Sequence, residues 1–412
     1  MHIIQRRLLS YEHFLADGDD NHRLVKVLDS LDADPLLSKL NKERNRRRDK
    51  YPYRMLWNTL IAAKVYGIAT IAGLVRELSR NPALREICGV KDTPKAYHYS
   101  RFLAKLAKPE NQELLLEMFH GVVHGLAGLL PEFGRSVAVD GTAISSRCNR
   151  FAKDKSDKDA GWGVRRRAGA DGSEEMKSWY GYSLMLAVDT KYELPVGFEL
   201  VPGNVNENPR LPVVLGEVKR RHPEMPADYV IADAGFDSKD NCRFVLSELG
   251  ALPIIKMRLT QEKEKEFSGA MCRCNELGTP VCSCGEFMVY SGRDGKYLKF
   301  RCPRHKQIRG GPCSDSTYGR VLKIAISEDE RRWPGLARQS KKWERLFRRR
   351  TAVERVNSRL KEHLQLDEQY VRGLGKITVN ATLSLLVMVG AASAMAKEQR
   401  WKDMRRIVRL AA

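Results

Sequence analysis

The sequence predicts an α/β protein with an all-helical N-terminal region and a β-rich, cysteine-rich insertion. Three observations support this. Residues 1–130 show helical periodicity with short helices, apolar strand patterns alternate with helical patterns after residue 135, and glycine, cysteine and basic residues replace that alternation between 260 and 340. We therefore expect a helical domain at 1–130, a core at 131–259, an insertion at 260–340, and helices at 341–412 that complete the core.

The charge of the chain indicates its partner. With 72 Lys and Arg against 51 Asp and Glu, the formal net charge is +21, which favours a polyanion. Nucleic acid is favoured over a membrane, because no basic amphipathic stretch ends in an aromatic-anchored apolar face. The first ten residues lack the apolar run of a signal peptide, so we expect a cytoplasmic, nucleoid-associated protein.

The N-terminal region reads as short helices joined by tight turns. Residues 51–66 have helical periodicity, Thr70 can cap a helix that runs to Leu78, and Thr93-Pro94 resembles the start of another helix. The turns at Gly67, Asn81-Pro82 and Gly89 favour a helix-turn-helix arrangement. An all-helical dimerisation domain is the alternative.

Two sets of side chains in this region would meet DNA if the helix-turn-helix interpretation holds. One set would line a DNA-facing helix: Lys95, His98, Tyr99, Arg101 and Lys105. The other is a basic run, expected to be a phosphate-contacting arm or a solvated linker: Lys42, Arg44, Arg46, Arg47, Arg48 and Lys50.

Two acids follow short apolar runs. Residues 136–140 end in Asp140 and are followed by Gly141-Thr142, which predicts a buried strand that ends in a turn. Residues 229–233 repeat this arrangement around Asp233. Because ligands bind beyond the carboxyl ends of strands in open α/β sheets, both carboxylates are expected to converge there.

The remaining core elements follow from the same patterns. Strands are expected near 180–189, 194–201 and 253–257, and helices near 208–221 and 238–249. Asp189 is expected to open a hairpin turn rather than to join a site, since Asp-Thr-Lys-Tyr-Glu-Leu-Pro separates two apolar runs.

A third acid lies in a predicted helix over residues 343–364. There Phe347, Arg350, Glu354 and Lys361 fall within an arc of roughly 60°, which places an aromatic ring, two cations and an acid on one face. This face is interpreted as a metal ligand flanked by phosphate-binding cations. A solvated face with ordinary ion pairs is the alternative.

These motifs together resemble the bacterial insertion-sequence transposases that have a DDE catalytic triad and a ribonuclease-H-like core. Their third-acid helix carries Tyr-x2-Arg-x3-Glu-x6-Lys, the Y-R-E-K signature, and here Phe347 replaces the Tyr. The other matching stretches are Val139–Thr142, Gly181–Asp189 with Leu194–Asn204, and Ala232–Asp237. The four stretches cover roughly residues 135–396 and are specific only in combination.

The resemblance implies a site and a reaction. Asp140, Asp233 and Glu354 would hold two Mg²⁺ ions, with Mn²⁺ as a substitute, while Arg350 and Lys361 would grip phosphates of double-stranded DNA. A homodimer in a synaptic complex would bind the terminal inverted repeats, cleave DNA by hydrolysis and join the 3′-hydroxyl ends to target DNA. The alternatives are an inactive DNA-binding descendant and a ribonuclease-H-fold nuclease without strand transfer.

A phosphatase of the haloacid-dehalogenase type also has an Asp-Gly-Thr turn. Its nucleophilic Asp would stand two residues before Asp140, where this chain has Ala138. The sequence therefore disfavours that class.

The insertion contains six of the nine cysteines. Clustered cysteines in a cytosolic protein favour a metal over disulfides, and a structural zinc site is expected. The candidate ligands for one or two Zn²⁺ ions are Cys272, Cys274, Cys282, Cys284, Cys302, His305 and Cys313. Trp333 beside them is a candidate for stacking on a displaced base.

One stretch near the C-terminus has the length of a membrane span. Residues 377–396 carry no charge, but they include Thr378, Asn380, Ser384 and other polar residues. A buried helix that packs on the sheet is the preferred interpretation.

Overall fold

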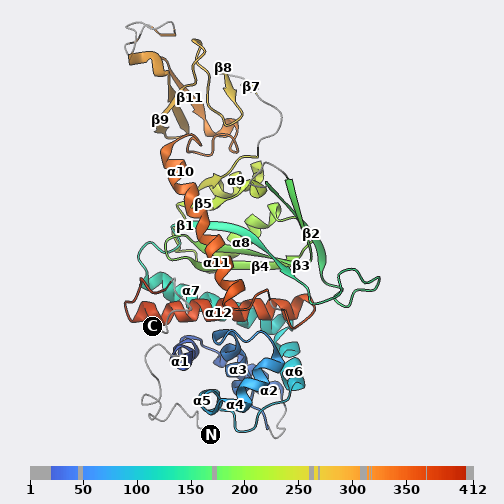
Figure 1. Cartoon of the computed structure of the whole chain (residues 1–412). Coiled ribbons are helices and arrows are strands. Elements are labelled where there is room, and N and C mark those ends of the chain that lie inside the picture. The colour runs from blue at the N-terminus through green and yellow to red at the C-terminus, as the bar shows by residue number, and fades with distance from the viewer. Residues whose placement is uncertain are drawn as a thin grey trace.

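The structure is a computed structural model that describes residues 20–404 except 45–49, 169–173, 259–263, 268–269, 307–312, 315, 317 and 368. Its parts are arranged along one long axis (Figure 1). The N-terminal helices lie at one end, the mixed sheet lies in the middle, and the β-rich insertion lies at the other end.

The central sheet contains both antiparallel and parallel strands. Strand β3 (Glu174–Asp189) pairs antiparallel with β1 (Ser136–Ser145) and with β4 (Leu194–Pro202). Strands β5 (Tyr229–Ala232) and β6 (Leu252–Ile255) continue the sheet parallel to β1. The resulting order, β4-β3-β1-β5-β6, is the expected ribonuclease-H-like arrangement of three antiparallel strands followed by two parallel ones.

Strand β1 is longer than the sequence predicts. The expected turn at Gly141-Thr142 is wrong, because β1 continues to Ser145 and keeps its pairing with β3 from Val137 opposite Asp189 to Ser145 opposite Gly181. Asp140 therefore lies within a strand. Asp233 follows the end of β5, as predicted, and its side chain accepts a hydrogen bond from the Gly235 amide at 2.8 Å.

One strand was not predicted from the sequence. Strand β2 (Gly161–Ala168) pairs antiparallel with the N-terminal half of β3, from Gly161 opposite Gly181 to Ala168 opposite Glu174. It extends the sheet beyond the five core strands.

Two helices that follow strands agree with the predicted ranges. The turn η2 (Asn208–Arg210) leads into α8 (Leu211–Arg221), and α9 (Lys239–Ser247) follows η3 (Ala234–Phe236). Ser238 caps α9, because its hydroxyl accepts a hydrogen bond from the Asn241 amide.

The predicted helix over residues 343–364 is interrupted. It consists of α10 (Lys341–Phe347), the 3₁₀ turn η6 (Arg348–Arg350) and α11 (Thr351–Glu362). The α10 segment packs against β5 and β6, η6 contacts β1 and β5, and α11 packs against β1 and β3. The three segments thus run across the sheet from β6 and β5 to β1 and β3.

The longest helix, α12 (Leu374–Lys397), is the predicted buried helix. It is long and apolar enough to cross a membrane, but 89% of its most apolar window lies inside the protein. It packs against β4 on one side and against α1, α3, α6 and α7 on the other. Within this packing the Asn380 side-chain amide donates a hydrogen bond to Gln369, and the Ser384 hydroxyl donates to the Leu364 carbonyl.

Seven helices precede the sheet in the described part of the chain: α1 (Asp20–Ser30), α2 (Asp34–Glu43), α3 (Tyr53–Val65), α4 (Ile71–Arg80), α5 (Pro82–Cys88), α6 (Ala96–Leu106) and α7 (Pro109–Leu129). Thr70 caps α4, as predicted, by accepting a hydrogen bond from the Gly73 amide. The N-cap of α6 is Lys95 rather than Thr93. Apolar residues from these helices and from the sheet form one continuous hydrophobic core.

The insertion is β-rich, as predicted, and has its own core. It contains the hairpin β7 (Glu264–Phe267) and β8 (Ala270–Asn275) and the three-stranded sheet β9 (Val289–Asp294), β10 (Tyr297–Arg301) and β11 (Val321–Ala325). Leu298, Phe300 and Trp333 are among the buried residues of this second core. The Arg331 guanidinium binds the buried carboxylate of Asp237 at 2.6 Å, which fastens the insertion to the central domain.

Candidate active site

Asp140 and Asp233 lie next to each other on adjacent parallel strands. Val139 pairs with Ala232 in the β1–β5 ladder, and the two aspartates are the next residues along these strands. Neighbouring strands lie about 4.8 Å apart, so the two backbones approach closely at this point. Two residues that are far apart in sequence are thus brought to one place.

Glu354 reaches the same area from α11. The Arg350 guanidinium donates a hydrogen bond to the Glu354 carboxylate at 2.7 Å, and Arg350 also acts electrostatically on Asp140. Glu354 is 47% exposed, while Arg350 is 23% exposed. Arg350 therefore interacts with two of the three candidate catalytic acids, with Glu354 directly and with Asp140 through its charge.

The environment of Asp140 disfavours its charged form. Its pKa is raised to about 7, mainly by burial and then by the negative charges of Asp233 and Glu207. The positive charges of Arg165 and Arg350 lower the pKa but offset only part of this rise. A carboxylate perturbed by burial and by like charges is characteristic of functional sites, where a bound cation would relieve the repulsion.

Phe347, at the aromatic position of the expected signature, packs against another aromatic ring. The Phe347 ring stacks on Trp343 with centroids 4.9 Å apart, and Arg350 lies 5.9 Å from the Phe347 ring. Phe347 thus supports the turn that presents Arg350, without a hydroxyl group.

Lys361 lies on the same helix but bonds the protein itself. Its ammonium group donates to the Ala143 carbonyl at 2.7 Å and pairs with Asp367 at 3.1 Å. The side chain is 25% exposed. Its contact with a phosphate remains a prediction.

Two further residues at this site were not predicted from the sequence. A Cβ atom on Gly141 would lie 2.8 Å from Glu207 Oε1 and 2.9 Å from Arg165 Nη2, so both side chains lie against the backbone next to Asp140. Arg165 belongs to the unpredicted strand β2, and Glu207 precedes η2. Nothing in their local sequence separates them from other surface ion pairs.

Only some of the residues that were predicted to face DNA from helix α6 are exposed in the structure. Lys95 and Arg101 are exposed, and the Arg101 guanidinium lies 5.2 Å from the ring of exposed Tyr97. The prediction for Tyr99 is wrong, because this side chain is fully buried in the core. Arg46, Arg47 and Arg48 of the basic run lie outside the described residues.

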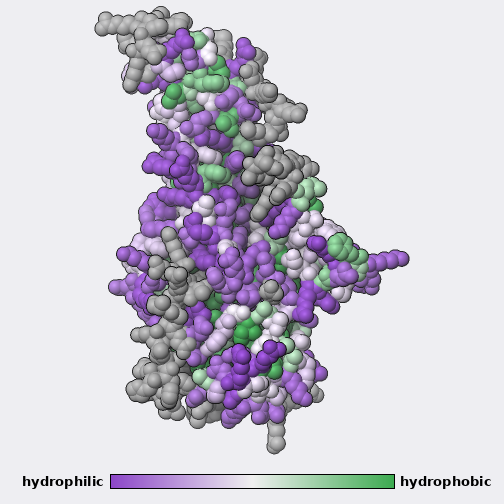
Figure 2. Space-filling model, viewed as in Figure 1, coloured by the Kyte–Doolittle hydropathy of each residue, from purple (hydrophilic) through white to green (hydrophobic). Residues whose placement is uncertain are grey.

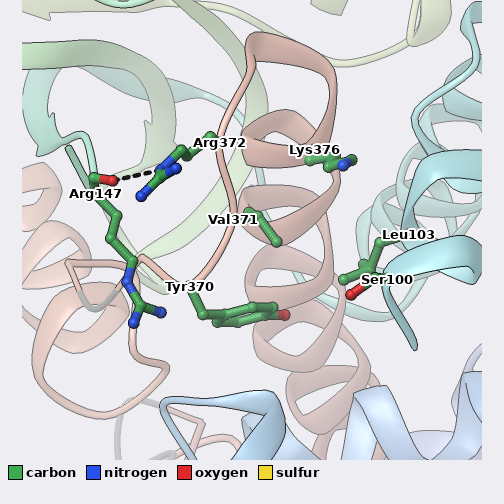
Figure 3. A pocket seen from close by; sticks show the side chains of 7 residues that line it. All are labelled: Ser100, Leu103, Arg147, Tyr370, Val371, Arg372 and Lys376. Carbon is green, nitrogen blue, oxygen red and sulfur yellow. Dashed lines mark hydrogen bonds between the residues drawn. The ribbon is translucent and has the colours of Figure 1, made fainter. Parts of the chain in front are cut away.

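A basic pocket lies beside α6. It has a volume of about 330 Å³, and Figure 3 shows Ser100 and Leu103 of α6 on one side, with Lys376 of α12 close to them. Arg147, Tyr370 and Arg372 line the other side, where Arg372 Nε donates to the Arg147 carbonyl at 2.7 Å. The lining residues include three cations and no acid.

Four cysteines of the insertion converge. The sulfur atoms of Cys282, Cys284, Cys302 and Cys313 all lie within 4.8 Å of one another. The Cys284–Cys302 and Cys302–Cys313 distances are 3.6 and 3.5 Å. Four thiolates at Zn–S distances of about 2.3 Å stand roughly 3.8 Å apart, so the set fits one tetrahedral zinc ion.

Of the other predicted zinc ligands, only Cys274 has a described side chain, and it does not join this cluster. Cys274 instead lies 3.5 Å from Arg332 Nη1. The side chains of Cys272 and His305 are outside the described residues.

Trp333 is not placed to stack on a base. It is 1% exposed, and its indole N–H donates to the Gly278 carbonyl at 2.8 Å. The stacking prediction is wrong for this reason, and Trp333 is a core residue of the insertion.

Comparison with known proteins found two matching family models. The model described as "Transposase DDE domain" matches residues 131–389, and the one described as "Transposase domain (DUF772)" matches residues 12–105. Among solved structures, a cryo-EM structure of the piggyBac transposase synaptic complex with hairpin DNA aligns with a TM-score of 0.42 and 10% identity, covering 95% of this chain and 79% of that chain. No curated protein sequence matches the chain.

Proposed function

The chain belongs to the DDE transposase family, and from this premise we propose that it is the transposase of a bacterial insertion sequence. In this proposal it binds the terminal inverted repeats, cuts DNA by metal-dependent hydrolysis and joins the free 3′-hydroxyl ends to target DNA. The observation that carries the proposal is the placement of Asp140 on β1 beside Asp233 at the end of β5, with Arg350 paired to Glu354 and acting electrostatically on Asp140.

The family implies the use of divalent metal, and the residues at the site suit such an ion. Asp140, Asp233 and Glu354 offer hard carboxylate oxygens, which Mg²⁺ and Mn²⁺ prefer. In the described part of the chain, no ion pair joins Asp140 or Asp233 to a cation, while Glu354 is paired with Arg350. Two Mg²⁺ ions held by these three acids would activate the attacking water and stabilise the leaving oxygen.

The protein's own residues would orient the DNA. Arg350 directly precedes α11 and acts electrostatically on Asp140, and its charge can compensate the negative charge that accumulates on a phosphate during cleavage. The face along α10 and α11 is mainly hydrophilic (Figure 2), as expected for a surface that receives a polyanion. The spacing of Phe347, Arg350, Glu354 and Lys361 supports assignment to the Y-R-E-K subgroup.

A second DNA contact is proposed on the N-terminal side. Positive charge near Ser100 comes from exposed Lys95 at the start of α6 and exposed Arg101 on α6. The basic pocket, which Lys376 helps to line, adds to it. Phosphate contacts of this kind would fix the position of the repeat without reading its sequence. We further propose that two copies of the chain act together on the two element ends.

A repeat-end assay tests the proposed function. A linear duplex that ends in the inverted repeat flanking the gene is incubated with the protein, Mg²⁺ and a circular target. Cut and joined products would support the transposase. Binding without cutting would indicate the inactive descendant, and cutting without joining would indicate a nuclease. Asp233→Asn is the matched control, because it replaces one carboxylate oxygen with an NH2 group and leaves the strand intact.

A further inference from the structure

Arg165 occupies a position at the active site that the family motifs do not assign. Its Nη2 atom would lie 2.9 Å from a Cβ on Gly141, the residue after Asp140. Its positive charge lowers the pKa of Asp140, whereas the negative charge of Asp233 raises it. Arg165 thus lies beside the first proposed catalytic acid.

Two contacts hold the Arg165 guanidinium in place. Nη2 donates to Glu207 Oε1 at 2.6 Å, and the guanidinium carbon lies 5.6 Å from the centroid of the Trp179 ring. Trp179 is itself fixed, because it is 5% exposed and its indole N–H donates to the Tyr182 carbonyl at 3.0 Å. An arginine held by a carboxylate and an aromatic ring loses little further freedom when it binds a ligand.

Most of the donor capacity of Arg165 is unused. A guanidinium group has five N–H donors, and within the described part of the chain the only hydrogen bond that Arg165 makes is the one from Nη2 to Glu207. The side chain is 32% exposed. A fixed, partly exposed cation with free donors beside carboxylates is suited to a phosphate, which guanidinium groups bind with two parallel hydrogen bonds.

We propose that Arg165 is a catalytic residue that binds the phosphate group at the point of cleavage, and that Glu207 is the positioning residue that holds Arg165 beside Asp140. This inference rests on the proposed function. Negative charge increases on the phosphoryl oxygens during cleavage, and Arg165 supplies a positive charge that is in place before DNA arrives. Glu207 orients the guanidinium through one end and leaves the other donors for DNA.

Single-turnover cleavage of the repeat-end duplex tests the catalytic part of the proposal. Loss of a charged hydrogen-bond donor to a phosphate predicts that Arg165→Gln cleaves about ten- to a hundredfold more slowly. Arg165→Lys keeps the charge and recovers part of this loss, while Glu207→Gln has an intermediate rate. Arg210→Gln is the control, because Arg210 forms a similarly exposed pair with Glu199. Cleavage by Arg165→Gln at the wild-type rate would overturn the proposal.

Salt-dependent DNA binding provides a readout that does not need cleavage. Removing one phosphate contact reduces the slope of log affinity against log salt by about 0.9. We expect this reduction for Arg165→Gln, but not for Arg165→Lys or Arg210→Gln. If the wild type binds the duplex and does not cut it, the transposase assignment fails, while the salt slopes still test Arg165. Unchanged slopes in a folded Arg165→Gln protein would leave this residue with a structural role only.

Discussion

The ammonium group of Lys361 lies 2.7 Å from the Ala143 carbonyl, which fastens the helix of Glu354 to the strand of Asp140. Ala143 stands three residues after Asp140, so this bond controls the distance between the first and third acids. Because a shift of about 1 Å at a catalytic group can cost about a hundredfold in rate, the bond is expected to matter more for cleavage than for folding.

Replacement of Lys361 tests this relationship. Lys361→Met is expected to lower the free energy of unfolding by only about 1 kcal/mol, since the side chain is partly exposed, and to slow cleavage by at least tenfold. Denaturant unfolding and single-turnover cleavage measure the two effects. Arg348→Gln, which removes an exposed ion pair with Glu344, serves as the control. A loss of stability with full activity would contradict the expectation.

Neutral replacements of the catalytic acids should separate catalysis from folding. Asp140→Asn is expected to reduce cleavage by at least about a hundredfold, because a metal ligand is lost. The same change should raise the melting temperature of the metal-free protein, because it removes a carboxylate that is buried beside Asp233 and Glu207. Calorimetry in a chelating buffer checks this, and a lower melting temperature would argue against crowding of the acids.

The cysteine cluster predicts one zinc ion per chain. Elemental analysis of purified protein should find this ratio, and Cys302→Ser should abolish it, since Cys302 lies 3.5 to 3.6 Å from two other sulfurs. Cys148→Ser changes a cysteine outside the cluster and should retain the metal. Zinc in the Cys302→Ser protein at the wild-type ratio would exclude this site.

A buried histidine pair predicts that stability falls in acid. His120 Nδ1 lies 2.8 Å from His222 Nε2, and burial, with Arg221 and neighbouring histidines, lowers the pKa of His120 to about 3 and that of His222 to about 4. The unfolded chain binds protons first, near pH 6.5, so stability is full above that pH and is lost as the pH falls toward 4.

Denaturant unfolding at pH 7.5 and pH 5 measures this dependence. Each histidine contributes at most about 1.4 kcal/mol per pH unit within the window. His120→Gln should weaken the dependence, whereas replacement of exposed His363 by Gln should not. Equal stability at both pH values would contradict the burial argument.

The basic pocket beside α6 should contribute to DNA affinity but not to the chemical step. Arg372→Gln and Lys376→Gln are each expected to weaken duplex binding and to reduce the salt slope by about 0.9. Cleavage of bound DNA should keep its wild-type rate. Arg220→Gln on α8 is the control for a general loss of surface charge. Filter binding at several salt concentrations measures the slopes.

Local patterns predicted the core elements other than β2, because apolar runs and helical spacing are encoded within short windows, while the catalytic role of the three acids stays a prediction. The extension of β1 beyond Asp140 could not be predicted in this way, since Gly141-Thr142 resembles a turn until pairing with β3 is known. Burial of Trp333 also depends on distant partners, because it packs against the Gly278 turn. Both errors arose where tertiary contacts outweigh local preference.

The Arg165–Glu207 pair shows the same limit at the active site. The two residues are 42 positions apart and meet only because β2 folds back on β3, and β2 itself was not predicted. Arg350 and Glu354 are four residues apart on one helix, so their pairing could be expected from spacing alone. Sequence reasoning thus anticipated that Asp140 and Asp233 meet at neighbouring strand ends, but missed the Arg165–Glu207 contact that depends on the unpredicted strand β2.

The two ends of the molecule differ in how they are joined to the middle. The insertion has a separate core, whereas apolar residues of the N-terminal helices merge with those of the sheet around α12. Over evolutionary time, related insertion sequences should therefore be able to exchange the segment that encodes the cysteine-rich insertion as one unit. The N-terminal helices must instead be inherited together with the sheet, so a change in the repeat recognition proposed for them has to arise by point substitution on the helix surfaces.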